Sequence, residues 1–281
     1  MFIRSLSVAL GPADHLVIRY SLVTILYLGG LALIRDWRIA RQDWPRLLAI
    51  SLIGMIGYNL GSAFGFELVP AGIGRLIIGT QPLLIALLAS VFTHEKLTPY
   101  PVAGLAVAFI GTGLLFRRDL ANAAANAPVL LGGLFIFLSG LAWAFYVVIS
   151  KPLIRKYGAY PVTALSISIA TLPMVSLLVS AETFETLRTM TARNWFDMAY
   201  MTALSTFLAT ITWNYGASRL SAATTGATLY LVPVIAVISG AIMLGEAITP
   251  DILAGGALII AGVAIAQIGP RMQRTQLDPN A

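Results

Sequence analysis

The sequence predicts an all-α membrane protein, on the grounds of its composition, its recurring apolar runs and an internal repeat. Hydrophobic residues make up 58% of the 281-residue chain and charged residues only 11%, and the mean hydropathy is +0.85. A soluble domain carries about 25% charged residues. A bilayer core, by contrast, accommodates helices of about 20 apolar residues. The composition therefore places most of this chain in lipid.

Apolar runs long enough to cross a bilayer recur along the chain, separated by short polar linkers. Several open with proline, which suits the first helical turn because its missing N–H would have no partner there. Thr98 and Thr249 precede two of these prolines as expected N-caps. The nine predicted spans are residues 14–34, 46–66, 73–93, 99–116, 128–149, 161–180, 195–216, 222–244 and 250–268.

The positions of Lys and Arg predict which side of the membrane each linker faces. Cationic residues favour cytoplasmic loops. If the linker at 35–46 is cytoplasmic, eleven Lys and Arg fall on that side and six on the other, while Arg19 lies within a span. This bias predicts a multi-pass protein of a bacterial inner membrane, with a cytoplasmic C-terminus and a polar cytoplasmic tail at 271–281.

Composition and motifs argue against several other functions. The net charge is +6, but the 18 Lys and Arg are scattered and do not form the basic face that nucleic-acid binding needs. The chain has no Cys, so we expect no thiolate metal site, and we expect no metal and no cofactor. Its two His residues lie at helix ends in different segments, and no H-E-x-x-H or G-x-S-x-G motif occurs. We therefore expect no catalytic residues, and an intramembrane enzyme is the remote alternative.

An internal repeat relates two halves of the chain without a gap. The segment at 71–115 aligns with the segment at 222–266 at an offset of 151 residues. A shared E-x-x-T-P step flanked by matching Pro and Gly does not arise easily by chance, so we predict two repeats, at 1–120 and 128–270. The matched pairs are Pro82 with Pro233, Glu95 with Glu246, Thr98 with Thr249, Pro99 with Pro250, Gly104 with Gly255 and Gly111 with Gly262.

The repeat also predicts orientation. Five spans, an odd number, separate equivalent helices, so the halves must be inverted with respect to each other. Inverted repeats are typical of secondary carriers, whose substrate site lies near the bilayer midplane between the halves. The same offset places the partner of the span at 128–149 upstream of Met1. We therefore expect a ten-helix design, five helices per half, with nine in this chain and the first helix missing upstream.

These motifs carry a family likeness. The run A-x-x-G…Q-P-L-L…H-E-K-L-T-P…G…G-T-G, with a second copy ending P-V…G-E-A-I-T-P…G-G…G, resembles the drug/metabolite transporter superfamily in its EamA-type ten-helix branch. The likeness extends over nearly the whole chain. The segment LSGLAWAFYVVISKPLIRKYG and the aromatic content are most similar to the YddG-type aromatic amino acid exporters. The resemblance implies export of amino acids, drugs or other metabolites.

Polar residues inside the spans are candidates for a transport pathway. They are costly in lipid and usually face the bundle interior, and residues three, four or seven positions apart share a helix face. Such residues form polar stripes along single helix faces. At the offset of 151 residues, two of these stripes align with each other, so that Asn59 is equivalent to Thr210 and Ser62 to Trp213. The expected cavity residues in these stripes are Tyr58, Asn59 and Ser62 with Phe66, then Ser139, Trp143 and Tyr146, and finally Thr210 and Trp213 with Thr206 and Asn214.

Pro82 and Pro233 are expected hinges. A proline within a helix removes one backbone hydrogen bond, which would free the carbonyls of Ile78 and Leu229 to face a cavity. Thr80, Gln81 and Tyr230 flank these breaks and complete the predicted substrate contacts. A kink that merely assists packing is the alternative.

Structural roles remain open for the other candidates as well. Ser and Thr commonly pack membrane helices together, and Trp or Tyr can mark the headgroup level, which applies to Trp143 near a helix end. Asn59 carries a full amide to satisfy, so binding and packing stand as equal alternatives there.

Carboxylates and filter motifs bear on mechanism. No Asp or Glu falls in the middle of a predicted span, and Glu95 and Glu246 are expected to support the adjacent caps. Ion-coupled carriers usually need an intramembrane carboxylate. A channel needs a polar ring or a filter motif, and none is visible in the sequence. We therefore predict an alternating-access, uncoupled exporter of aromatic or hydrophobic amino acids, with a broad drug or metabolite exporter as the alternative. The expected partners are that small molecule and membrane lipid, and the oligomeric state is open, a monomer included.

Overall fold

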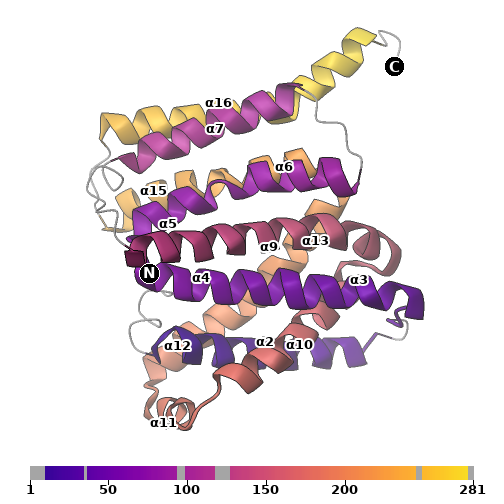
Figure 1. Cartoon of the computed structure of the whole chain (residues 1–281), viewed down its shortest axis with the longest axis vertical. Coiled ribbons are helices and arrows are strands. Elements are labelled where there is room, and N and C mark those ends of the chain that lie inside the picture. The colour runs from indigo at the N-terminus through magenta and orange to yellow at the C-terminus, as the bar shows by residue number, and fades with distance from the viewer. Residues whose placement is uncertain (1–9, 35–36, 94–98, 118–126, 245–248, 278–281) are drawn as a thin grey trace. The chain divides into compact units, whose positions relative to one another are not determined.

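The computed structural model describes residues 10–34, 37–93, 99–117, 127–244 and 249–277. Within these ranges the chain is helical and contains no strand (Figure 1). Five helices there are long and apolar enough to cross a membrane: Pro12–Ala32, Arg41–Leu68, Gly72–Phe92, Ala127–Tyr157 and Ala159–Leu178. Shorter apolar helices at Pro99–Leu115, Thr224–Ile235 and Ile252–Ala266 coincide with three further predicted spans. The predicted all-α membrane fold is confirmed.

The remaining predicted span, 195–216, is helical but irregular, because α12, a π-helical segment and α13 follow one another without a break. The elements are α2 (Pro12–Ala32), η1 (Arg41–Asp43), α3 (Trp44–Ala49), η2 (Ile50–Ile56), α4 (Gly57–Leu68), α5 (Ala71–Ile78), α6 (Gln81–Phe92), α7 (Pro99–Leu115), α9 (Ala127–Tyr157), α10 (Ala159–Leu178), α11 (Ala181–Thr189), α12 (Ala192–Tyr200), η3 (Met201–Leu208), α13 (Ala209–Arg219), α14 (Ala222–Leu229), α15 (Leu231–Leu244) and α16 (Pro250–Leu277).

The helix bounds reproduce the offset of 151 residues found in the sequence. α5 and α14 begin and end at equivalent residues, and the break at Gly79 and Thr80 corresponds to the break at Tyr230. The two π-helical segments, η2 and η3, also begin at equivalent positions. A π segment is rare and usually a single turn, so its recurrence at the same place agrees with the repeat found in the sequence.

The chain divides into two compact units, each made of two stretches. Unit 1 comprises residues 1–64 and 149–219, and unit 2 comprises residues 65–148 and 220–281. Each unit therefore combines equivalent helices from both sequence repeats.

Unit 1 is built on the packing of α2 against α10 and η3, while α10 also packs against η2. A hydrogen bond of 2.8 Å from the Thr24 hydroxyl to the Thr171 hydroxyl joins α2 to α10. At the start of α2, the carboxylate of Asp14 accepts hydrogen bonds from Thr183 (2.6 Å) and Thr186 (2.7 Å) of α11. These bonds tie the short linker helix α11 to a membrane helix.

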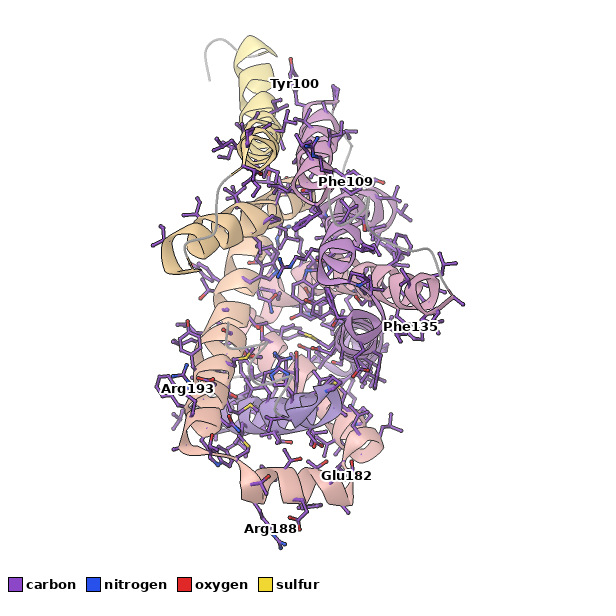
Figure 2. The ribbon with its side chains drawn as sticks, turned by 90° about the vertical axis from the view of Figure 1, so that its left-hand side faces the viewer. Tyr100, Phe109, Phe135, Glu182, Arg188 and Arg193 are labelled. Carbon is purple, nitrogen blue, oxygen red and sulfur yellow. The ribbon has the colours of Figure 1, made fainter. Side chains whose placement is uncertain are left out.

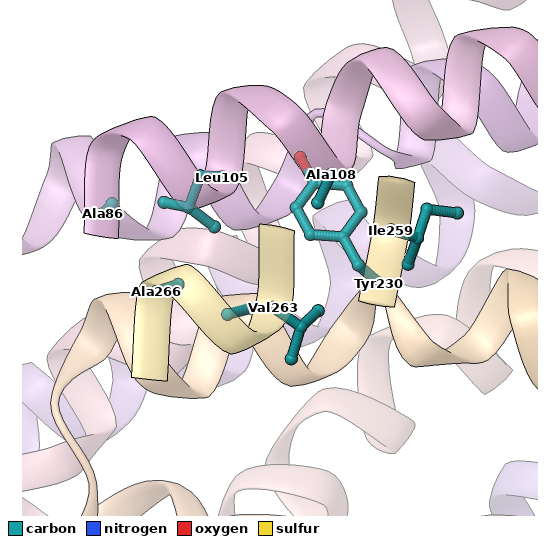
Figure 3. Close-up of a cluster of buried hydrophobic side chains, with 8 residues drawn as sticks. Ala86, Leu105, Ala108, Tyr230, Ile259, Val263 and Ala266 are labelled. Atoms are coloured by element: carbon teal, nitrogen blue, oxygen red, sulfur yellow. The ribbon is translucent and has the colours of Figure 1, made fainter. Parts of the chain in front are cut away.

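Unit 2 contains the pair α7 and α16, which run alongside each other (Figure 1). Between them lies an apolar cluster that Tyr230, at the break between α14 and α15, also enters (Figure 3). The buried members of this cluster are Ala86, Leu105, Ala108, Ala227, Tyr230, Ile259, Val263 and Ala266.

Two predicted boundaries differ from the structure. α9 does not end at 149 but continues through Pro152 to Tyr157, and Gly158, at φ 89°, separates it from α10. Glycine adopts this left-handed conformation without strain, which is why helices often end there. α16 continues to Leu277, past the predicted end of its span at 268. The caps predicted at Glu95, Thr98 and Glu246 lie outside the described residues.

Candidate functional site

Asn59, a predicted substrate contact, is held inside unit 1 by two hydrogen bonds. Its Oδ1 accepts 2.7 Å from the Tyr20 hydroxyl of α2, and its Nδ2 donates 2.8 Å to the carbonyl of Met55. Met55 lies in the π segment η2, where the changed ladder leaves backbone carbonyls in need of other donors. The side chain is only 4% exposed. Asn59 therefore joins α2 to α4, whatever else it binds.

The sequence placed Arg19 within a span but did not identify it as a site residue. It precedes Tyr20 in α2, and its guanidinium lies 5.0 Å from the centre of the Tyr20 ring. Its Nε is buried and makes no hydrogen bond. Tyr58, the neighbour of Asn59 in α4, is half-buried. A cation within a membrane span is by default a functional-site hypothesis, and that rule would have found it.

His15 lies one helical turn before Arg19 on the same face of α2. Its side chain is 6% exposed, and its Nε2 is buried without a hydrogen-bond partner. From the sequence, His15 is only a residue at the end of a predicted helix. The structure instead shows one imidazole nitrogen and one guanidinium nitrogen, one helical turn apart, that are buried and form no hydrogen bond with any described residue.

The other candidates of unit 1 have more ordinary surroundings. The Ser62 hydroxyl donates to the carbonyl of Asn59 in its own helix at 3.2 Å. Asn214 donates 2.7 Å to the Thr163 hydroxyl of α10 and is fully buried. Thr210 and Trp213 are half-buried in α13. The charged residues Glu182, Arg188 and Arg193, by contrast, lie on the exposed surface of α11 and α12 (Figure 2).

In unit 2, Gln81 brings two predicted regions together. It begins α6, is 5% exposed, and has a buried Nε2 without a hydrogen-bond partner. A Cβ atom on Gly140 of α9 would lie 3.2 Å from its Cγ. Ser139, the neighbour of Gly140, is fully buried and donates to the carbonyl of Ile136 at 2.8 Å. The break before α6 and the polar stripe of α9 are therefore in contact.

The stripe on α9 continues with two stacked rings. The ring centroids of Trp143 and Tyr146 are 5.4 Å apart and the planes are inclined by 23°. Tyr146 is fully buried, whereas Trp143 is half-buried. Tyr146 therefore packs in the interior, and Trp143 stacks on it with part of its surface accessible.

The helix breaks at the two prolines have a common geometry. Pro82 is the second residue of α6 and Pro233 the third of α15, so each lies in a first helical turn, where its missing N–H leaves no gap. The interruptions fall just before, where Thr80 N–H donates to Ile77 at 3.0 Å and Tyr230 N–H to Ala227 at 3.2 Å. The Thr80 hydroxyl also donates to the Ile77 carbonyl, at 2.7 Å.

Tyr230 differs from the other candidates because its ring is packed in the apolar cluster of unit 2 (Figure 3). It is 1% exposed, yet its hydroxyl is buried without a hydrogen-bond partner. A buried hydroxyl normally has a partner.

Among the described residues no group of three His, Asp or Glu side chains is placed to hold a metal ion.

Similar proteins are named as transporters, and some as exporters of amino acids. A "Probable terminal-alkyne amino-acid exporter" of Streptantibioticus cattleyicolor is 30% identical over 80% of this chain and 73% of its own length. A "Probable amino-acid metabolite efflux pump" of Salmonella typhimurium is 26% identical over 84% and 82%. An "Uncharacterized transporter" of Archaeoglobus fulgidus is 23% identical over 91% and 88%.

A solved structure and a family profile also match this chain. A solved crystal structure superimposes with a TM-score of 0.77 at 20% identity, covering 96% of this chain and 93% of that one. The family profile described as "EamA-like transporter family" matches residues 1–117 and again 130–267. The expectation of a small-molecule transporter rather than an enzyme is thus confirmed, and the chain belongs to the EamA-like transporter family.

Proposed function

We propose that this transporter exports amino acids with aromatic or hydrophobic side chains across a bacterial-type inner membrane. The observation that carries the proposal is the similarity to two relatives named for amino-acid export, each of which aligns with four fifths or more of the chain. Small zwitterions need polar partners for their two charged ends and an apolar wall for the side chain. Both kinds of surface occur among the candidate residues.

The aromatic preference is supported by the stacked pair Trp143 and Tyr146. Ring contacts favour another aromatic group by about 0.5–1.5 kcal/mol beyond simple burial. The half-buried Trp143 offers such a contact, while Tyr146 fixes its orientation.

Polar groups that could bind the ends of a substrate occur in each unit. In unit 2, Gln81 and Tyr230 each have a buried polar atom without a partner, and Thr80 lies beside the break before α6. In unit 1, Asn59 lies beside the π segment η2. Irregular backbone at membrane depth is tolerated where it lines a cavity or is buried in protein, and transporters place substrate sites at such points.

We further propose alternating access by two inverted repeats, at 1–120 and 128–270, with a tail at 271–281 on the cytoplasmic side. The two separate matches of the family profile and the recurrence of helix bounds at 151 residues support this division. The excess of Lys and Arg in the linkers grouped with 35–46 supports the orientation.

Transport is proposed to be uncoupled from ion gradients. The carboxylates of the membrane region that the structure describes lie near helix ends, and the buried Asp197 forms an ion pair with Arg193 at 3.0 Å. A carboxylate that must bind and release protons or sodium would be expected deeper in a span.

Counterflow into proteoliposomes tests the proposal. Purified chain is reconstituted into vesicles preloaded with one unlabelled amino acid, and entry of the labelled one is measured for a panel of amino acids and cationic drugs. We expect accumulation of Trp, Phe and Leu, weak accumulation of Asp and Lys, and none in protein-free vesicles. Accumulation of the drugs but of no amino acid would instead establish the broad exporter.

A further inference from the structure

Arg19 lies where a charge is costly. It is seven residues into α2, which places it about 10 Å from the start of the helix at about 1.5 Å per residue. Its Nε is buried without a hydrogen bond, and no carboxylate among the described residues pairs with it. An intramembrane cation is normally neutralised by a partner in the bundle. The described part of the chain therefore leaves this charge unbalanced.

The chemistry of the guanidinium limits what can balance it. Arginine presents a planar fork of N–H donors that matches the two oxygens of a carboxylate. Arginine does not lose its proton at ordinary pH, so the free-energy cost of burying its charge cannot be avoided by deprotonation. An anionic or zwitterionic ligand with a free carboxylate satisfies both the charge and the geometry.

His15 supplies a second nitrogen on the same side of the helix. It is four residues before Arg19, a spacing that places side chains one above the other. The Nε2 of His15 is buried without a hydrogen-bond partner, as is the Nε of Arg19. The His15 Nε2 and the Arg19 Nε, both without a hydrogen-bond partner, therefore belong to one cluster on the same face of α2.

The surroundings hold this cluster in place. The ring of Tyr20 supports the guanidinium at 5.0 Å, and Tyr20 is itself anchored to Asn59 by a hydrogen bond of 2.7 Å. A positioned cation bordered by the Tyr20 ring suits a carboxylate attached to an apolar or aromatic body.

We propose that Arg19, with His15 as a second donor, binds the carboxylate of the transported molecule and so selects substrates with a free carboxylate over the corresponding esters, amides and amines. This inference rests on the proposed function, since it takes an amino acid as the cargo. It adds the group that is recognised and the residues that recognise it.

Binding of four phenylalanine-related ligands tests the inference. The full chain in detergent is titrated calorimetrically with phenylalanine, its methyl ester, its amide and phenethylamine, which lacks the carboxylate. Charge-assisted hydrogen bonds predict that phenylalanine binds about tenfold to hundredfold more tightly than the other three. Arg19→Gln should remove this preference by weakening phenylalanine alone, and Arg19→Lys should retain part of it.

The matched control is Arg188→Gln, which removes an exposed arginine paired with Glu185 on α11 and should leave all four affinities unchanged. His15→Gln should reduce the preference less than Arg19→Gln. If the Arg19 variants do not fold, the ligand series on the parent chain still decides, because equal affinity for phenylalanine and its ester overturns the inference.

The two proposals can fail separately. If counterflow detects amino acids but the parent does not distinguish acid from ester, the carboxylate assignment is wrong and the proposed function stands. If no amino acid is transported, the proposed function is wrong, and the ligand series is repeated with 3-phenylpropionate and its methyl ester. Preference for that acid, lost in Arg19→Gln, supports the assignment, and its absence overturns it.

Discussion

The carbonyl oxygen of Gly104 in α7 lies 2.5 Å from the position that a Cβ atom of Gly262 in α16 would occupy. The reciprocal contact joins Gly111 to Gly255, where the same distance is 2.7 Å. Gly104 is equivalent to Gly255 in the repeat, and Gly111 to Gly262. The earlier glycine of each helix therefore meets the later glycine of the other, which means that these two equivalent helices pack antiparallel, as an inverted repeat requires.

Replacing Gly262 should weaken this helix pair. Small residues let membrane helices approach closely, and the two atoms nearest to a new side chain would be backbone atoms of α7, the Ala108 nitrogen and the Gly104 oxygen. We expect Gly262→Val to destabilise the protein by about 1–3 kcal/mol, the usual cost of overpacking. Unfolding in mixed micelles with increasing dodecyl sulfate measures the loss. Gly256→Val is the control, since nothing lies within 4 Å of its Cβ position, and equal losses in both variants would contradict the close-packing explanation.

The π segment η3, one of the two in unit 1, accepts a hydrogen bond from a tyrosine of another helix. The hydroxyl of the fully buried Tyr27 donates a hydrogen bond of 2.9 Å to the carbonyl of Phe207 in η3. Tyr27→Phe should cost about 0.5–1.5 kcal/mol, because it removes the donor and leaves the ring packing in place. The same unfolding assay measures it, with Tyr215→Phe as the control at a tyrosine that is 53% exposed. A change no larger than that of the control would show that the carbonyl finds another donor.

Much of the fold could be predicted from sequence because lipid imposes a simple rule on it. Helices must carry their own backbone hydrogen bonds, so apolar length alone located the spans, and the offset of 151 residues located equivalent breaks. Pro82 and Pro233 marked these breaks within a few residues. The structure places the interruption just before each proline, since a proline is accommodated in the first turn of the next helix.

The irregular parts and the site were harder to predict. The residues of η2, ISLIGMI, have the composition of an ordinary apolar helix, and nothing in them marks the π geometry that the structure shows where η2 packs against α10. Asn59 could be recognised as an amide needing partners, but its bond to Tyr20 joins residues 39 positions apart. Arg19 and His15 could not be identified from the distribution of charge between linkers, because what distinguishes them is a buried nitrogen without a hydrogen-bond partner, which only the structure shows.

The orientation can be measured cleanly because the chain contains no cysteine. Asn280→Cys reports on the C-terminal tail and Thr189→Cys on the exposed end of α11. In intact cells, a membrane-impermeant maleimide should label Thr189→Cys at once and Asn280→Cys only after lysis, because the Lys and Arg bias puts the tail in the cytoplasm. The cysteine-free parent controls for background. The reverse pattern would show that the proposed topology is inverted.

Net flux should persist when ion gradients are removed. Vesicles loaded with phenylalanine are diluted into amino-acid-free buffer at the same pH and sodium concentration, with an ionophore present to collapse residual gradients. We expect downhill efflux at a rate within about twofold of that with gradients imposed, since the described spans hold no carboxylate deep enough to couple an ion. Efflux that stops without a proton or sodium gradient would refute the uncoupled mechanism. Neutralising Asp197 would then be the next variant to test, because Asp197 is the buried carboxylate paired with Arg193.

Trp143 gives the sharpest test of the aromatic preference. It is half-buried on α9 and stacks on the fully buried Tyr146, so it can present a ring to a substrate without losing its own support. Loss of one aromatic contact of about 0.5–1.5 kcal/mol corresponds to roughly threefold to tenfold slower transport. Trp143→Ala should therefore slow efflux of Trp and Phe by that factor, while efflux of a small amino acid such as Ala changes little.

The comparison requires equal amounts of folded protein in the membrane. Trp143→Phe should restore most of the rate for aromatic substrates, because it retains a ring at the same position. Trp195→Ala, which removes an exposed tryptophan from α12, controls for the general loss of an indole. If Trp143 only marks the headgroup level, Trp143→Ala will transport both classes of amino acid as the parent does. A uniform slowing of both classes would indicate instead that the Trp143–Tyr146 stack supports the helix rather than the substrate.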